Sequence, residues 1–321
     1  MMRWPWWSRL LAQVFFVLFA VGTLSFMMAE TLPGDAAYRI AASRYGYDLM
    51  DTASAEAVRA ELGLDRPAVV RWAGWLGEMA KGKLGTAMVS GEPVEHEVAS
   101  QLGHTLYLSL VAWLMAVVLG LAMGLWTALH PAGWLRRGVD ALNTVLRASP
   151  AFLLGVMLST VLAVHLDWLP VAGHGEAEHV FLPALTLALA LSPGFTQVVR
   201  DAALKVLGSD AFEFAQIKGL PLSAALRRHA LPQTLLATLA YAGIQLVILI
   251  EGMVVVESLF AWPGIGHALV HAVIARDVPM IQGTALTMAL MFVLLNGLID
   301  ALLRRLDPRM ADAQMATEVQ R

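Results

Sequence analysis

The segment EFAQIKGLPLSAALRRHALP, from Glu213 to Pro232, is a polar, charged stretch between two long apolar runs. Each of those runs, residues 180–199 and 233–256, has the length of a membrane-spanning helix, which takes about 20 residues. Charged side chains are costly to place in lipid. We therefore expect this polar segment to stand outside the membrane, in contact with water or with another protein.

The composition of the whole chain predicts a polytopic membrane protein. Of its 321 residues, 58% are hydrophobic and 15% are charged, whereas soluble domains carry about 25% charged residues. The mean hydropathy is +0.64. A net charge of −3 gives no indication of nucleic-acid binding. The absence of cysteine excludes disulfides and thiol chemistry.

Apolar runs predict an all-α fold with six transmembrane helices. The first run follows Arg3 and Arg9 and has the features of a signal peptide, but the poor cleavage site after it favours an uncleaved anchor over residues 1–29. The third run is interrupted by Arg147 and by Ser149-Pro150. The expected spans are residues 10–29, 105–129, 139–166, 180–199, 233–256 and 281–303.

Residues 30–100 differ in character from the spans. They carry charges of both signs and many Gly and Pro residues, and the stretch 55–82 has helical periodicity. We expect a small helical subdomain here. The membrane core is then expected at residues 101–306, with helices outside the lipid at about 206–232, and a polar tail at 307–321.

The distribution of Lys and Arg predicts the orientation. Both termini and the Glu213–Pro232 segment fall on the side that is rich in Lys and Arg, whereas the short loops 167–179 and 257–280 contain only Arg276. Cytoplasmic loops carry the excess of Lys and Arg. We therefore expect both termini and the polar segment in the cytoplasm, and the 30–100 subdomain outside.

Within the polar segment, Glu213, Ala215 and Gly219 follow the spacing E-x-A-x-x-x-G. Glycine permits a sharp turn and Pro221 suits the start of a helix. A helix–turn–helix centred on Gly219-Leu220-Pro221 is therefore expected. A solvated loop is the alternative interpretation.

This segment resembles the EAA motif of permease subunits in binding-protein-dependent ABC importers, with Phe214 in place of the usual alanine. Further segments resemble the peptide and nickel subfamily of these permeases, in order along nearly the whole chain. They are LPGD at 32–35, LGLDRP at 62–67, KGKLGTAM at 81–88, VVVESLFAWPGIGHALVHAVIARDVPMIQG at 254–283 and LDPRM at 306–310.

The resemblance implies a type I ABC importer permease fold in the bacterial inner membrane. It implies four kinds of partner: a second homologous permease, one or two ATP-binding subunits, a periplasmic or lipid-anchored binding protein, and the lipid bilayer. The EAA segment would couple ATP hydrolysis to transport by fitting a cleft of the ATP-binding subunit. The matching residues are Glu213, Ala215, Gly219, Arg227, Arg228, His229 and Pro232.

The chain itself is expected to be neither an enzyme nor a cofactor-binding protein. It has no G-x-x-x-x-G-K-[ST] phosphate loop, so ATP and Mg²⁺ would be used by the partner subunits. No Ser/His/Asp arrangement and no H-E-x-x-H motif occur either. The alternative of a self-sufficient secondary transporter or channel would call for inverted repeats or broken midplane helices, and no internal symmetry is evident.

Three ionisable residues within the spans are candidates for the translocation path. Glu257 matches a glutamate common in the subfamily, where it would be structural or part of a gate. Arg147 and Glu251 depart from the subfamily pattern, and we expect them to recognise a charged or zwitterionic substrate. Helical rise places them at roughly 13 Å and roughly 27 Å from the inner side, which disfavours a direct salt bridge. Structural contacts with the partner permease are the alternative.

Two further sites lie in the expected outer loops. Phe260, Trp262, Pro263 and Gly264 would form part of the outer mouth, or else anchor the chain at the interface. His174 and His179, with two glutamates between them, are weak candidates for metal binding. The resemblance to the peptide and nickel subfamily implies peptides as cargo, with nickel or a metal chelate as the alternative.

Overall fold

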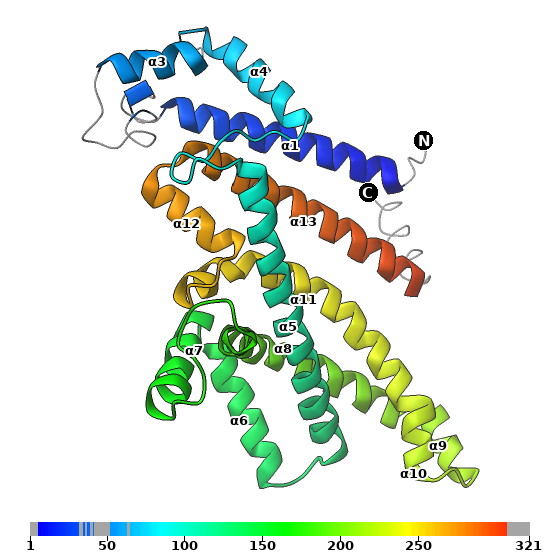
Figure 1. The fold of residues 1–321 in the computed structure, drawn as a ribbon. Coiled ribbons are helices and arrows are strands. Elements are labelled where there is room, and N and C mark those ends of the chain that lie inside the picture. The colour runs from blue at the N-terminus through cyan, green and yellow to red at the C-terminus, as the bar shows by residue number, and fades with distance from the viewer. Residues whose placement is uncertain are drawn as a thin grey trace. The chain divides into compact units, whose positions relative to one another are not determined.

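The computed structural model describes residues 6–31, 35, 37, 38, 41, 52–62 and 65–306. Across these ranges the regular structure is helical, apart from an isolated β-bridge between Thr86 and Pro93, so the all-α prediction is confirmed (Figure 1). The α-helices are α1 (Trp6–Thr31), α3 (Thr52–Leu62), α4 (Ala68–Ala80), α5 (Val94–Leu129), α6 (Trp134–Ala148), α7 (Ala151–Leu158), α8 (Phe181–Leu207), α9 (Asp210–Ile217), α10 (Leu222–Ala225), α11 (Leu231–Leu259), α12 (Ile265–Ala275) and α13 (Val278–Leu306). Segments of other helical types are the π-helices η2 (Ser159–His165) and η4 (Leu226–Ala230) and the 3-10 helix η3 (Ala177–Val180).

Five helices in the described ranges are long and apolar enough to cross a membrane, namely α1, α5, α8, α11 and α13. A sixth crossing is formed if α6 and α7 count as one bent span. The predicted spans are therefore present, with different ends. The largest difference is α5, which begins at Val94 rather than at residue 105 and so continues through the boundary expected at residue 100.

The third predicted span, 139–166, is not one straight helix. Its two halves, α6 and α7, meet at Ser149 and Pro150 with a bend of 112°. Proline lacks an N–H and disfavours helical geometry in the residue before it, and Ser149 accordingly adopts an extended conformation (φ −93°, ψ 125°). The sequence indicated an interruption here, but not a change of direction this large.

Contacts between Cα atoms divide the chain into two units, Met1–His104 with Pro263–Gly297, and Thr105–Trp262 with Leu298–Arg321. In the second unit, α5 packs on α8 through two glycines. A Cβ atom on Gly120 would lie 2.2 Å from Cβ of Phe195, and one on Gly124 would lie 2.6 Å from Cβ of Val199. Small residues four apart allow helix backbones to approach closely in membranes. This G-x-x-x-G pair, which the sequence reading missed, thus sets the spacing of α5 and α8.

Helix α8 also packs along α11 in this unit, although Pro193 lies in its middle. Proline cannot donate to the carbonyl four residues earlier, which here is that of Leu189. The Ser192 hydroxyl donates to this carbonyl at 3.0 Å instead. The helix therefore stays continuous from Phe181 to Leu207.

In the first unit, α4 packs against α1. Trp72 donates from Nε1 to the Thr23 hydroxyl at 3.3 Å, and the Trp75 ring occupies the space beside Gly22. The expected subdomain helices around residues 55–82 are thus present as α3 and α4. The predicted tail at 307–321, most of the LPGD segment and two residues of LGLDRP lie outside the described residues.

Candidate functional site

The predicted helix–turn–helix is confirmed in residues 209–232. Helix α9 begins after Ser209, whose Oγ accepts a hydrogen bond from the Phe212 N–H at 3.4 Å. Asp210 and Glu213 lie in its first turn, where acidic side chains stabilise a helix through its dipole. Helix α10 starts after Pro221 and leads through η4 into α11. Figure 1 shows α9 and α10 together at the beginning of α11.

The end of α9 explains the spacing between Ala215 and Gly219. The Leu220 N–H donates to the Ala215 carbonyl at 3.1 Å, and the Gly219 N–H donates to the Gln216 carbonyl at 2.9 Å. This pair of bonds is the Schellman motif, which calls for a left-handed residue just after the helix. Gly219 has φ +84°, a value that costs glycine little.

Apolar and charged side chains share the surface of this turn. Phe214, Ile217 and Leu222 are 57%, 75% and 56% exposed, while Phe212 is buried against Ala225 and Ala230. The Lys218 ammonium lies 4.5 Å from the centre of the Phe214 ring. The remaining predicted coupling residues are also at or near this surface: Glu213, Arg227, Arg228 and Pro232 are exposed, and Ala215 and His229 are half-buried.

Of the predicted path residues, Arg147 has the clearest surroundings. Its guanidinium donates to Oε1 of Gln197 at 2.9 Å and to the Pro193 carbonyl at 3.4 Å. Both partners are on α8 and both are uncharged. The structure therefore places Arg147 against α8. Glu251 lies on α11, and its side chain lies outside the described part of the chain.

Glu257 lies in the packed interior of the second unit. Its side chain is fully buried, and its Oε1 accepts a hydrogen bond from the Thr105 hydroxyl at 2.6 Å. One turn further along α5, the Ser109 hydroxyl lies 2.9 Å from Sδ of Met253. These contacts join α5 to α11. They favour the structural interpretation of Glu257 over that of a residue lining an open path.

The residues predicted for the outer mouth are largely buried within the chain. Phe260 is buried, and its carbonyl accepts a hydrogen bond from the Gly173 N–H at 3.0 Å. Trp262 is buried and stacks on Tyr107, with ring centres 6.3 Å apart. Pro263 and Gly264 lead into α12, the short helix expected in this loop. A role at a mouth stays a prediction for these four residues.

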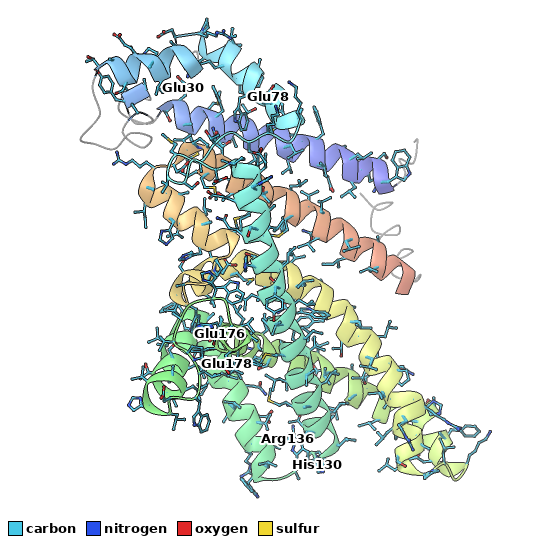
Figure 2. The ribbon with its side chains drawn as sticks, viewed as in Figure 1. Glu30, Glu78, His130, Arg136, Glu176 and Glu178 are labelled. Carbon is cyan, nitrogen blue, oxygen red and sulfur yellow. The ribbon has the colours of Figure 1, made fainter. Side chains whose placement is uncertain are left out.

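The weak metal candidates do not gather into a site. Among the described residues, no group of three or more His, Asp or Glu side chains could hold a metal ion. Figure 2 shows Glu176 and Glu178 in the segment that precedes α8. His179 lies in η3, with its ring against Gly173. The geometry thus gives no support to metal binding at His174 and His179.

Comparisons with known proteins agree with this architecture. Residues 116–312, more than half of the chain, match the family described as "Binding-protein-dependent transport system inner membrane component". The chain belongs to this family. It is thus a multi-pass inner-membrane permease subunit of a binding-protein-dependent ABC importer.

Relatives extend the match beyond the family segment. The "Glutathione transport system permease protein GsiC" of Escherichia coli O6:H1 (strain CFT073) is 35% identical over 295 residues, covering 91% of this chain and 94% of that protein. GsiC of Pectobacterium atrosepticum is 36% identical over 291 residues, with the same coverage. An inward-facing structure of the MetNI methionine ABC transporter has a TM-score of 0.55 at 20% identity, covering 66% of this permease and 96% of that chain. This last likeness shows the type I permease fold.

Other residues with a place in the permease went unnoticed in the sequence. Asp140 of α6 and Arg200 and Asp201 of α8 lie on the facing sides of those two helices, beside Arg147 and Gln197. The signal was present as polar residues at positions 197, 200 and 201, a spacing that places them on one helical face. Their partner helix, however, is not evident from that spacing.

Proposed function

We propose that this permease forms half of the translocation path for short peptides and is coupled to an ATP-binding subunit through α9 and α10. The proposal rests on the Gly219 turn, where two backbone hydrogen bonds close the end of α9 and large apolar side chains on the same segment are exposed. Exposed large apolar residues on a polar segment are typical of a protein interface. Rigid attachment to α11 would let a movement of the partner reach the membrane helices.

The orientation supports the same partner. Lys218, Arg227 and Arg228 belong to this segment, and an excess of Lys and Arg is typical of cytoplasmic loops. We infer that the turn and both termini face the cytoplasm, where ATP is available. A second homologous permease would complete the path, and a binding protein on the outer side would deliver the substrate.

Peptides are the proposed cargo because the GsiC relatives are named for glutathione transport, and glutathione is a tripeptide. Nickel or a metal chelate is the alternative, and the described residues offer no metal-binding group in its favour. Uptake of radiolabelled glutathione, dialanine and NiCl₂ by proteoliposomes with the complete importer and its binding protein would decide. Uptake of nickel without either peptide would contradict the peptide proposal.

The coupling role is tested by Gly219→Pro. Proline cannot adopt φ +84° and has no N–H to donate to Gln216, so the end of α9 must change. We expect normal membrane insertion and a peptide uptake that is reduced more than about tenfold, which corresponds to a loss of more than about 1.4 kcal/mol of coupling free energy. ATP hydrolysis should no longer be stimulated by the loaded binding protein.

A matched control is Gly91→Pro. Gly91 also has a positive φ, +76°, and its N–H also donates to a backbone carbonyl, that of Ala87, at 3.1 Å. It lies in a loop of the other unit. Uptake at the unsubstituted level in Gly219→Pro, or an equal loss in both variants, would remove the support for a coupling turn.

A further inference from the structure

Helices α6 and α8 border a half-open cavity of about 610 Å³ in the second unit. Pockets of roughly 300–1,000 Å³ hold small molecules in proteins. This one has a polar wall, because α6 is amphipathic and the face that borders the cavity carries charged and amide side chains. Its polar residues are Asp140, Asn143 and Arg147 from α6, and Gln197, Arg200 and Asp201 from α8.

The charges around the cavity are unevenly paired. Asp140 accepts from Nη1 of Arg200 at 3.1 Å, and Nε of Arg136 lies 3.5 Å from its other oxygen. Arg136 stands at the start of α6 (Figure 2). Arg147, by contrast, has only uncharged partners, and no basic side chain of the described ranges pairs with Asp201. One cation and one anion therefore border the cavity without an ion pair.

Two polar atoms in the wall also lack partners. Oδ1 of Asn143 and Nε of Arg200 are buried without a hydrogen bond. Buried polar atoms are usually satisfied, and an exception calls for a physical reason. Oδ1 of Asn143 is an acceptor, so an ammonium group bound in the cavity would give it a partner.

The spacing of the charges suits a short peptide. Arg147 contacts α8 at Pro193 and Gln197, whereas Asp140 contacts it at Arg200, so the two helices are antiparallel. Along α8, the two contacts of Arg147, at Pro193 and Gln197, come eight and four residues before Asp201, or about 12 Å and about 6 Å of helix. The termini of an extended dipeptide or tripeptide lie about 7–10 Å apart, since each residue adds roughly 3.4 Å.

We propose that the α6–α8 cavity binds the two charged ends of a dipeptide or tripeptide. The carboxylate is held by Arg147, and the ammonium group is held at the Asp201 end, where Asn143 accepts one of its hydrogen bonds. This inference rests on the proposed function. Peptides would be selected first by the binding protein and then a second time by this site within the permease. Arg147 lies within an expected span, where a charge without a counter-charge is costly, and a zwitterionic cargo would balance Arg147 and Asp201 at once.

Direct binding tests the cavity separately from transport. The complete importer complex, without its binding protein, is placed in nanodiscs of phosphatidylglycerol, and binding of radiolabelled dialanine is measured. Loss of a charge-assisted contact, worth about 1.5–3 kcal/mol, corresponds to an increase in Kd of roughly 10- to 100-fold. We expect that increase in Arg147→Gln and in Asp201→Asn, and an unchanged Kd in Arg137→Gln, which changes an exposed arginine of α6 outside the cavity.

The blocked forms of the peptide assign the two ends. Dialanine amide has no carboxylate for Arg147 to bind, so it should bind the unsubstituted complex weakly. Its Kd should therefore be the same for Arg147→Gln. N-acetyl-dialanine should behave in the same way toward Asp201→Asn. A zwitterionic lipid headgroup offers the same pair of charges, so the measurement is repeated with phosphatidylethanolamine. Loss of dialanine binding in that lipid would assign the cavity to lipid and overturn the proposal.

Failure of this inference is distinguishable from failure of the proposed function. Peptide uptake by the full system with no dialanine binding to the complex alone, or with the same Kd in all variants, would overturn the cavity site and leave the peptide importer intact. Absence of peptide uptake in the full system would overturn the proposed function itself, whatever the binding result.

Discussion

Helices α9 and α12 end with the same backbone geometry but with different residues at the critical position. In each, a left-handed residue follows the last turn: Gly219, with φ +84°, comes one residue after Lys218, and Arg276, with φ +56°, comes directly after Ala275. In each, the following N–H reaches back five residues to a carbonyl. The two bonds are Leu220 to Ala215, at 3.1 Å, and Asp277 to Ala272, at 2.8 Å.

The difference shows two ways of specifying a helix end. Glycine adopts the left-handed conformation freely, so the end of α9 depends on its own backbone. An arginine there costs about 1–2 kcal/mol, and other contacts must offset this. Asp277, only 2% exposed, supplies them. It accepts from the N–H groups of Met88 at 2.6 Å, Val89 at 3.0 Å and Met280 at 3.1 Å.

The largest effect is expected where the end of α12 depends on distant residues. In Asp277→Ala, three backbone N–H groups lose a charged acceptor, and the buried one, that of Met280, is left unsatisfied. Together these losses cost about 2–4 kcal/mol. We expect a lower midpoint of thermal unfolding in detergent, with faster amide hydrogen exchange at residues 84–93 and at the end of α12.

The variant Asp277→Asn serves as the control for Asp277→Ala. Asparagine keeps one acceptor oxygen and the ability to cap α13, so it should lose less than half as much. If Asp277→Ala instead exchanged at the unsubstituted rate in residues 84–93, Asp277 would not hold the end of α12, and the contrast with α9 would disappear.

A smaller effect is expected in Gly219→Ala. The added Cβ meets nothing within 4 Å, so the change is purely conformational and costs about 1–2 kcal/mol. Because the end of α9 is local, faster exchange should be confined to residues 210–225. Exchange that spreads into α8 or along α11 would show that this end, too, depends on distant contacts.

The same contrast explains which parts of this permease were predictable. Apolar runs predicted the spans, and Gly219 with Pro221 predicted the α9 turn, because both depend on neighbours in the sequence. The 112° bend at Pro150 was indicated only as an interruption, since its angle depends on what α7 packs against. A short-range sequence pattern predicts the helix or turn that contains it, but not how that element packs on others.

Pairings between helices were out of reach for the same reason. Arg147 was predicted to be a path residue, but its partner Gln197 is 50 residues away. Neither local sequence predicts this contact. Gly120 and Gly124 were readable as a close-packing pair, but not the fact that Phe195 and Val199 fill the space against them. The candidate cavity therefore appeared only once α6 and α8 were placed side by side.

The smallest effect, and one of opposite sign, is expected in Arg276→Gly. Removing the side chain relieves about 1–2 kcal/mol of left-handed strain, and the greater freedom of glycine in the unfolded chain offsets about 0.5–1 kcal/mol of this. A net stabilisation of about 0.5–1 kcal/mol should remain, seen as a slightly higher unfolding midpoint. Arg276→Ala, which removes the charge but keeps the Cβ, should give no such gain in stability.

A gain in stability in both variants would show that loss of the charge is the cause, and that the backbone of Arg276 is not strained. Asp277 would then have no strain to offset, and α9 and α12 would differ only in the reach of their contacts.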